Sequence, residues 1–177
     1  AYRAFQEAAR LEPSLAMAYW GQALVLGPNI NAVMEPADEP RALALIQKAL
    51  SLLDSVSAKE RALILALSKR YTGVTNERVA NDHAYAAVMH LAYAQFPEDQ
   101  DIAMLYVESM MNLRPWNYWM PDGQPYEGTA EIVSITEEVL RKNLMHPGAL
   151  HLYIHLIEAT NAPERAEAVA DRLLTLM

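Results

Sequence analysis

The chain has no cysteine among its 177 residues. It therefore forms no disulfide, binds no metal through a thiolate and has no cysteine nucleophile. It also lacks any run of about 18 apolar residues, the length that spans a bilayer. The six glycines are isolated, so none forms a phosphate-binding glycine-rich loop. These absences exclude several common kinds of site, and they leave the compartment open between cytoplasm and periplasm.

Positive charge is also scarce. Lys and Arg total 14 against 22 Asp and Glu, which gives a formal net charge of -8. A general nucleic-acid binder or a polybasic membrane binder needs the opposite excess. Apolar residues make up 53% and charged residues 20%, as in globular chains rather than disordered ones. We therefore expect one folded domain over residues 1–177, with neither nucleic acid nor a membrane as partner.

Apolar residues recur at helical spacing along the chain, and strand signals are sparse. The pattern predicts nine helices, at residues 2–11, 14–26, 38–53, 57–71, 76–95, 99–113, 129–145, 147–160 and from 163 onward. Ser57 and Glu60 have the spacing of a capping box, and Ser14 and Thr129 are the expected caps of two other helices. Both ends of the chain lie in helical patterns without caps, so we interpret the chain as part of a longer array, of unknown oligomeric state.

The predicted helices pair into hairpins that close with one spacing. A distance of five positions recurs in Ala8–Pro13, Ala49–Asp54, Ala92–Pro97 and Lys142–Pro147. Such hairpins bury their faces against neighbouring hairpins. The sequence therefore predicts an all-α fold, an α-solenoid of about nine antiparallel helices arranged as a superhelix.

The residues around these spacings resemble tetratricopeptide (TPR) repeats. The small–large–small–breaker order of the second TPR helix is followed at Ala1, Phe5, Ala8, Pro13 and at Ala42, Ile46, Ala49, Asp54. The same spacing recurs with departures from the small residues at Tyr85, Met89, Ala92, Pro97 and at Ile135, Val139, Lys142, Pro147. Segments 114–119 and 146–159 are similar to those of uncharacterised bacterial TPR proteins, which implies no known reaction. The resemblance implies a non-enzymatic scaffold that binds a protein or peptide in a concave groove.

In TPR arrays the first helix of each repeat lines the groove. By that analogy the groove residues are Met17, Trp20, Ala58, Arg61, Leu65, Lys69, Asp101, Met104, Glu108 and Met111, with His151 and Glu158 beyond them. The groove is then basic near Arg61 and Lys69 and acidic near Asp101 and Glu108. Peptides or partner helices are the usual ligands of such a surface.

One polar cluster stands apart, because His151, His155 and Glu158 share one face of a predicted helix. Two histidines at i, i+4 can chelate a divalent ion, Glu158 can be a third ligand, and His146 lies just before the helix. Leu152 occupies the place of a metalloprotease general base, so a hydrolytic zinc site is poorly supported. The cluster is therefore a polar groove lining or a hydrogen-bonding contact to the next repeat without a cofactor, a divalent-metal site, or a catalytic site.

The segment 114–128 contains three prolines and two glycines and is predicted to be irregular. It concentrates aromatic residues at Trp116, Tyr118 and Trp119, which form either a binding surface or a loop folded back with its rings buried. An enzyme with a pocket under this loop is a further alternative, although no catalytic residue can be assigned.

Overall fold

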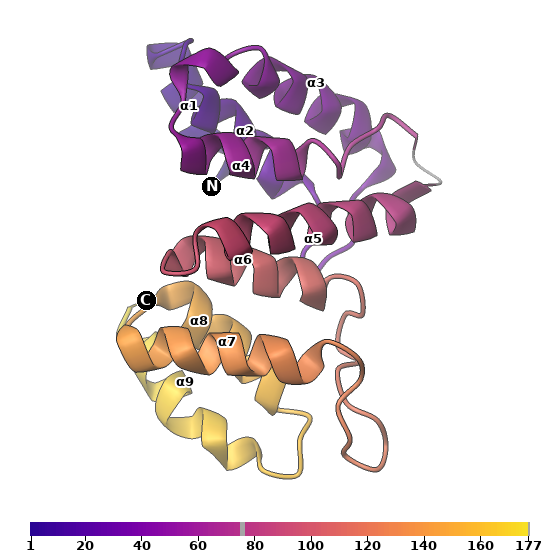
Figure 1. Cartoon of the computed structure of the whole chain (residues 1–177), viewed down its shortest axis with the longest axis vertical. Coiled ribbons are helices and arrows are strands. Elements are labelled where there is room, and N and C mark those ends of the chain that lie inside the picture. The colour runs from indigo at the N-terminus through magenta and orange to yellow at the C-terminus, as the bar shows by residue number, and fades with distance from the viewer. Residues whose placement is uncertain (75–76, 177) are drawn as a thin grey trace. The chain divides into compact units, whose positions relative to one another are not determined.

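The computed structural model describes residues 1–74 and 77–176 (Figure 1). Over these ranges the chain is all-helical, with nine α-helices, and its only β-type pairings are isolated bridges between Asn29 and Ala32 and between Trp119 and Pro125. The all-α prediction is confirmed. The chain divides into two compact units, unit 1 (Ala1–Phe96) and unit 2 (Pro97–Met177). Within the described residues, no helix combines the length and the apolar character that a membrane span requires.

Unit 1 contains five α-helices and two short 3₁₀ turns. They are α1 (Tyr2–Leu11), α2 (Ala16–Leu26), η1 (Pro36–Asp38), α3 (Glu39–Leu50), η2 (Leu53–Ser55), α4 (Ala58–Leu67) and α5 (Arg78–Gln95). Helix α2 packs against α1, α3 and α4, while α4 packs against α2, α3 and α5 (Figure 1). Each of these two helices is therefore a centre of packing in the unit.

Small residues bring the helices of unit 1 close together. The Phe5 ring of α1 lies directly over Gly21 of α2, where an added Cβ would be 2.4 Å from a ring carbon. On α3, Ala42, Ile46 and Ala49 are all buried. Small side chains at a crossing allow close backbone approach, and a large neighbour fills the space beside them.

Unit 2 contains the remaining helices. They are α6 (Gln100–Met111), α7 (Thr129–Lys142), α8 (Pro147–Ile157), η4 (Pro163–Ala166) and α9 (Glu167–Leu174). Helix α8 packs against α6, α7 and α9, so it is the central helix of this unit. Its buried residues are largely apolar, among them Leu150, Leu156 and Ile157.

The helix boundaries follow the sequence prediction at several places and depart from it at others. The capping box of Ser57 and Glu60 is confirmed at the start of α4. The cap prediction for Ser14 is wrong, because α2 has Leu15 at its N-cap and the Ser14 hydroxyl bonds to the Glu12 carboxylate. The predicted start of the fifth helix at residue 76 lies outside the described residues.

The cap prediction for Thr129 is also wrong. Gly128 occupies the N-cap of α7 with a φ of +83°, a conformation that favours glycine. The Thr129 hydroxyl is buried and donates instead to the Tyr118 carbonyl at 2.9 Å. It therefore ties the irregular segment to the start of α7.

Candidate functional site

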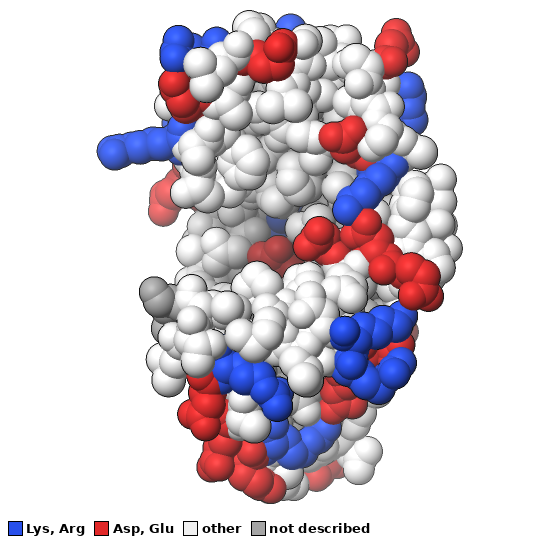
Figure 2. All heavy atoms as spheres, turned by 90° about the vertical axis from the view of Figure 1, so that its left-hand side faces the viewer, with Lys and Arg blue, Asp and Glu red and all other residues white. Residues whose placement is uncertain are grey.

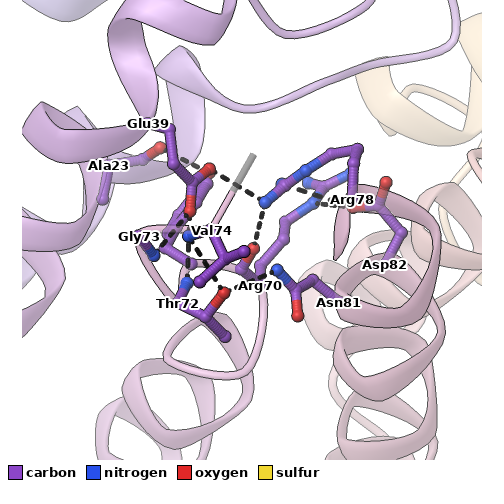
Figure 3. Close-up of polar contacts among 10 residues, drawn as sticks. Ala23, Glu39, Arg70, Thr72, Gly73, Val74, Arg78, Asn81 and Asp82 are labelled. Carbon is purple, nitrogen blue, oxygen red and sulfur yellow. Dashed lines mark hydrogen bonds and ion pairs between the residues drawn. The ribbon is translucent and has the colours of Figure 1, made fainter. Parts of the chain in front are cut away.

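Unit 1 contains a cluster of charged residues, which we call the clasp: the buried Glu39, Arg70 and Asp82 and the half-buried Arg78 (Figure 3). Glu39, at the start of α3, is only 2% exposed. Its Oε1 accepts the backbone N–H groups of Thr72 and Gly73, both at 3.1 Å, and its Oε2 accepts from Arg78 Nη2 at 2.9 Å. One carboxylate thus holds the segment after α4 and the start of α5.

Arg70 forms the other half of the clasp. It is 2% exposed, and its Nε donates to Asp82 Oδ1 at 2.8 Å. Its guanidinium lies 4.7 Å from the centroid of the Tyr85 ring. The carbonyl of Arg70 accepts from Arg78 Nη2 at 2.5 Å. Two cations and two carboxylates balance one another here, as burial of charge requires, so the clasp is an internal connection between helices.

The predicted groove residues of α4 and of the turn after it are exposed. Arg61, Leu65 and Lys69 are exposed, as is Ala58, and we call these four the α4 stripe. On α2, Met17 and Trp20 are half-buried. The Trp20 indole N–H donates to the Leu63 carbonyl at 3.1 Å, so Trp20 joins α2 to α4 beside the α4 stripe.

The predicted groove residues of α6 divide between surface and core. Asp101 is exposed and Glu108 is half-buried. Met104 and Met111 are 5% and 0% exposed, which corrects their assignment to an open groove. The reason is that α6 packs against both α7 and α8, so more than one face of the helix is covered.

The histidines of α8 lie together. His151 Nε2 and His155 Nε2 are 3.0 Å apart, and their ring centroids are 4.8 Å apart. His151 is exposed, whereas the His155 side chain is 16% exposed. Partial burial, followed by the proximity of His155, lowers the pKa of His151 below its usual range. We call these two residues the histidine pair.

Neither Glu158 nor His146 contacts the Nε2 atoms of His151 and His155 that face each other. Glu158 Oε1 lies 2.9 Å from Nδ1 of His155, on the opposite side of the ring from Nε2. His146 caps α8, since its Nδ1 accepts the Ala149 N–H at 3.2 Å. Its Nε2 is 3.4 Å from Asp101 Oδ1. The structure therefore brings His151 and His155 together without Glu158 or His146 as a third ligand, and among residues 1–74 and 77–176 no group of three such side chains is placed to hold a metal ion.

The irregular segment 114–128, here called the aromatic loop, lies against α8. The Trp119 indole N–H donates to the Leu156 carbonyl at 2.7 Å. Tyr118 is buried, which raises the pKa of its phenol. Trp116 is 51% exposed and meets His155 edge to face, with ring centroids 4.8 Å apart. The loop is thus folded back at Tyr118 and Trp119 but keeps one aromatic residue at the surface.

Trp116 also has an unusual backbone. Its φ is +63°, and in the described part of the chain it is the only residue other than glycine with a positive φ. A bulky residue in this conformation costs about 1 kcal/mol or more, and such strain is concentrated at functional sites. The aromatic residues of the loop could be recognised in the sequence, whereas no sequence pattern predicts that Trp116 contacts His155.

Protein-family models, curated proteins and solved structures include no match to this chain.

Proposed function

We propose that the chain is a helical-repeat interaction module of the TPR type, and that the α2–α4 face of unit 1 binds a peptide segment with acidic and apolar side chains. The observation that carries this proposal is a repeated packing relation. Helix α2 contacts α4 past the intervening α3, and α6 contacts α8 past α7. Stacked helical hairpins place their first helices side by side in this way, and the two first helices then share a surface.

The chemistry of that surface favours an acidic and apolar ligand. The α4 stripe offers two cations, Arg61 and Lys69, on either side of Leu65, which is 40% exposed. Arg61 and Leu65 are four apart and share one face of α4, and Lys69 follows in the turn after the helix ends at Leu67. A carboxylate on the ligand pairs with either cation, and an apolar side chain covers Leu65.

A display library of short peptides, selected on the full chain, tests the proposal. We expect the selected peptides to be rich in Asp and Glu with an apolar residue between them. The double variant Arg61→Glu plus Lys69→Glu should weaken their binding at least about tenfold, since two attractive charges become repulsive. Fluorescence polarisation with labelled peptide measures the loss.

Arg3→Glu plus Lys48→Glu is the matched control, because it makes the same charge change at exposed positions on α1 and α3. Binding should survive in this variant. Equal loss in both double variants, or a selection that yields no binding peptide, would overturn the proposed surface.

A further inference from the structure

The contacts of the histidine pair point to a second binding site, in unit 2. We propose that His151 and His155 bind one divalent transition-metal ion of the Cu²⁺ or Ni²⁺ type through their two Nε2 atoms, beside Trp116. This inference goes beyond peptide binding and concerns different residues, so either proposal can fail without the other.

The spacing of the two nitrogens favours one class of metal. The Nε2 atoms are 3.0 Å apart. An ion held at about 2.0–2.1 Å from each imidazole nitrogen subtends an angle of about 91–97° between them. That angle suits the tetragonal geometry of Cu²⁺ and Ni²⁺ better than the tetrahedral geometry of Zn²⁺. Cu²⁺ also has the highest affinity of the divalent first-row ions for nitrogen ligands.

Glu158 prepares His155 for this role. With Glu158 Oε1 2.9 Å from its Nδ1, His155 donates the Nδ1 proton to the carboxylate and leaves the Nε2 lone pair toward His151. Metal-binding histidines commonly have such a carboxylate behind them, because it fixes the tautomer and the ring orientation. Glu158 is therefore a positioning residue.

His151 supplies the second nitrogen. Without metal it donates its own Nε2 proton to His155 across the 3.0 Å contact. On binding, His151 changes to its Nδ1–H tautomer and gives the Nε2 lone pair to the ion, so a neutral pair releases no proton. His151 is exposed, and two protein ligands leave the other coordination positions to water or to a ligand donor.

Trp116 lies against the histidine pair, and its fluorescence can report metal binding. Its ring meets that of His155 at a centroid distance of 4.8 Å, with the planes at 81°. The Trp116 backbone has a φ of +63°, and its half-exposed ring lies beside the histidine pair. A paramagnetic ion bound to His155 therefore lies close enough to quench the fluorescence of Trp116.

The test is a titration of the full chain, without a histidine tag, with CuSO₄, NiCl₂ and ZnCl₂ separately. Tryptophan fluorescence and calorimetry are read for the wild type, His151→Ala and His155→Ala. We expect one Cu²⁺ per chain, with affinity at least about tenfold lower in each variant, because one of two ligands is lost. His83→Ala plus His90→Ala, on α5, is the matched control and should bind as the wild type does.

Equal Cu²⁺ affinity in the wild type and both α8 variants would overturn the site. Tighter binding of Zn²⁺ than of Cu²⁺ would overturn the choice of metal. Glu158→Gln separates positioning from ligation: we expect affinity about 10–100-fold lower, with the same number of nitrogen couplings in the electron paramagnetic resonance spectrum of Cu²⁺. Wild-type affinity in Glu158→Gln would overturn its role, and circular dichroism melting curves check that each variant is folded.

Discussion

The two compact units differ most clearly in where they keep their charged side chains. Unit 1 has nine basic and nine acidic residues, and its charged residues Glu39, Arg70 and Asp82 are buried. Unit 2 has five basic and 13 acidic residues, so it carries the whole net charge of the chain, and in its described part no Asp, Glu, Lys or Arg is buried. Figure 2 shows acidic and basic side chains lying beside one another on one face of the molecule.

This difference shows two ways of fixing a helical unit. In unit 1 the clasp joins α3, the segment after α4 and α5 through paired charges, which specify one arrangement because a misplaced partner leaves a buried charge unpaired. In unit 2, Trp119 to Leu156 and Thr129 to Tyr118 are neutral connections to backbone carbonyls, and ion pairs between elements, such as Arg165 with Glu137, are half-exposed. The acidic residues there remain in water, where their mutual repulsion is screened.

The largest expected effect comes from breaking the clasp. Arg70→Met should lower the free energy of unfolding by about 3–5 kcal/mol, because Asp82 loses its closest buried partner. Arg165→Met removes an ion pair with Glu137 that is 2.6 Å long but half-exposed, and should cost about 1 kcal/mol or less. Urea denaturation of the full chain, followed by circular dichroism, compares them.

A companion variant sharpens this test. Arg70→Met plus Asp82→Leu removes both charges and should recover much of the lost stability. If Arg70→Met lowers the free energy of unfolding no more than Arg165→Met does, the buried ion pair of unit 1 contributes no more stability than the half-exposed ion pair of unit 2.

The second comparison uses one helical glycine from each unit. Gly21→Ala should destabilise the protein by about 1–3 kcal/mol, because its Cβ would lie 2.4 Å from the Phe5 ring. Gly148→Ala in α8 has its nearest neighbour at 3.4 Å, on His146, and should be neutral or stabilising by up to about 1 kcal/mol. The midpoint of thermal unfolding should therefore fall in Gly21→Ala and stay the same or rise in Gly148→Ala. Equal shifts in the two variants would contradict the close packing at Gly21.

Two tryptophans allow the third comparison. Trp20 in unit 1 and Trp119 in unit 2 each donate an indole N–H to a helix carbonyl, at 3.1 Å and 2.7 Å. Replacement of either by Phe removes that hydrogen bond and should cost about 1 kcal/mol, with the larger loss at the shorter bond of Trp119. Denaturant midpoints measure both, and no loss at Trp119 would show that its bond does not hold the aromatic loop on α8.

The sequence predicted the helices well because apolar periodicity and proline or glycine breakers are local signals. The first helix, at residues 2–11, and the capping box of Ser57 and Glu60 were predicted correctly for this reason. The caps at Ser14 and Thr129 were not, because each hydroxyl has another partner. The clasp was missed because Glu39 and Arg78 are 39 positions apart, and a pair so distant leaves no periodic pattern.

The candidate site was predicted in part. Helical spacing correctly placed His151 and His155 together, since residues four apart share a face. Spacing along the helix does not determine which ring nitrogen of His155 contacts Glu158. In the structure it is Nδ1, so Glu158 is not beside the Nε2 atoms. Met104 and Met111 were assigned to a groove by analogy with TPR repeats, whereas the packing of α6 against two helices buries them.

The smallest expected effect is on the titration of the histidine pair. The clasp brings opposite charges together, whereas α8 brings two imidazole rings together. Partial burial and His155 therefore lower the pKa of His151 below 6.5. Because the unfolded chain takes up this proton at higher pH than the folded one, the stabilisation is present above pH 6.5 and is lost as pH falls through the lowered pKa. NMR titration of the metal-free protein measures the pKa, which should rise in His155→Ala, and an unchanged value there would show that the two rings do not interact.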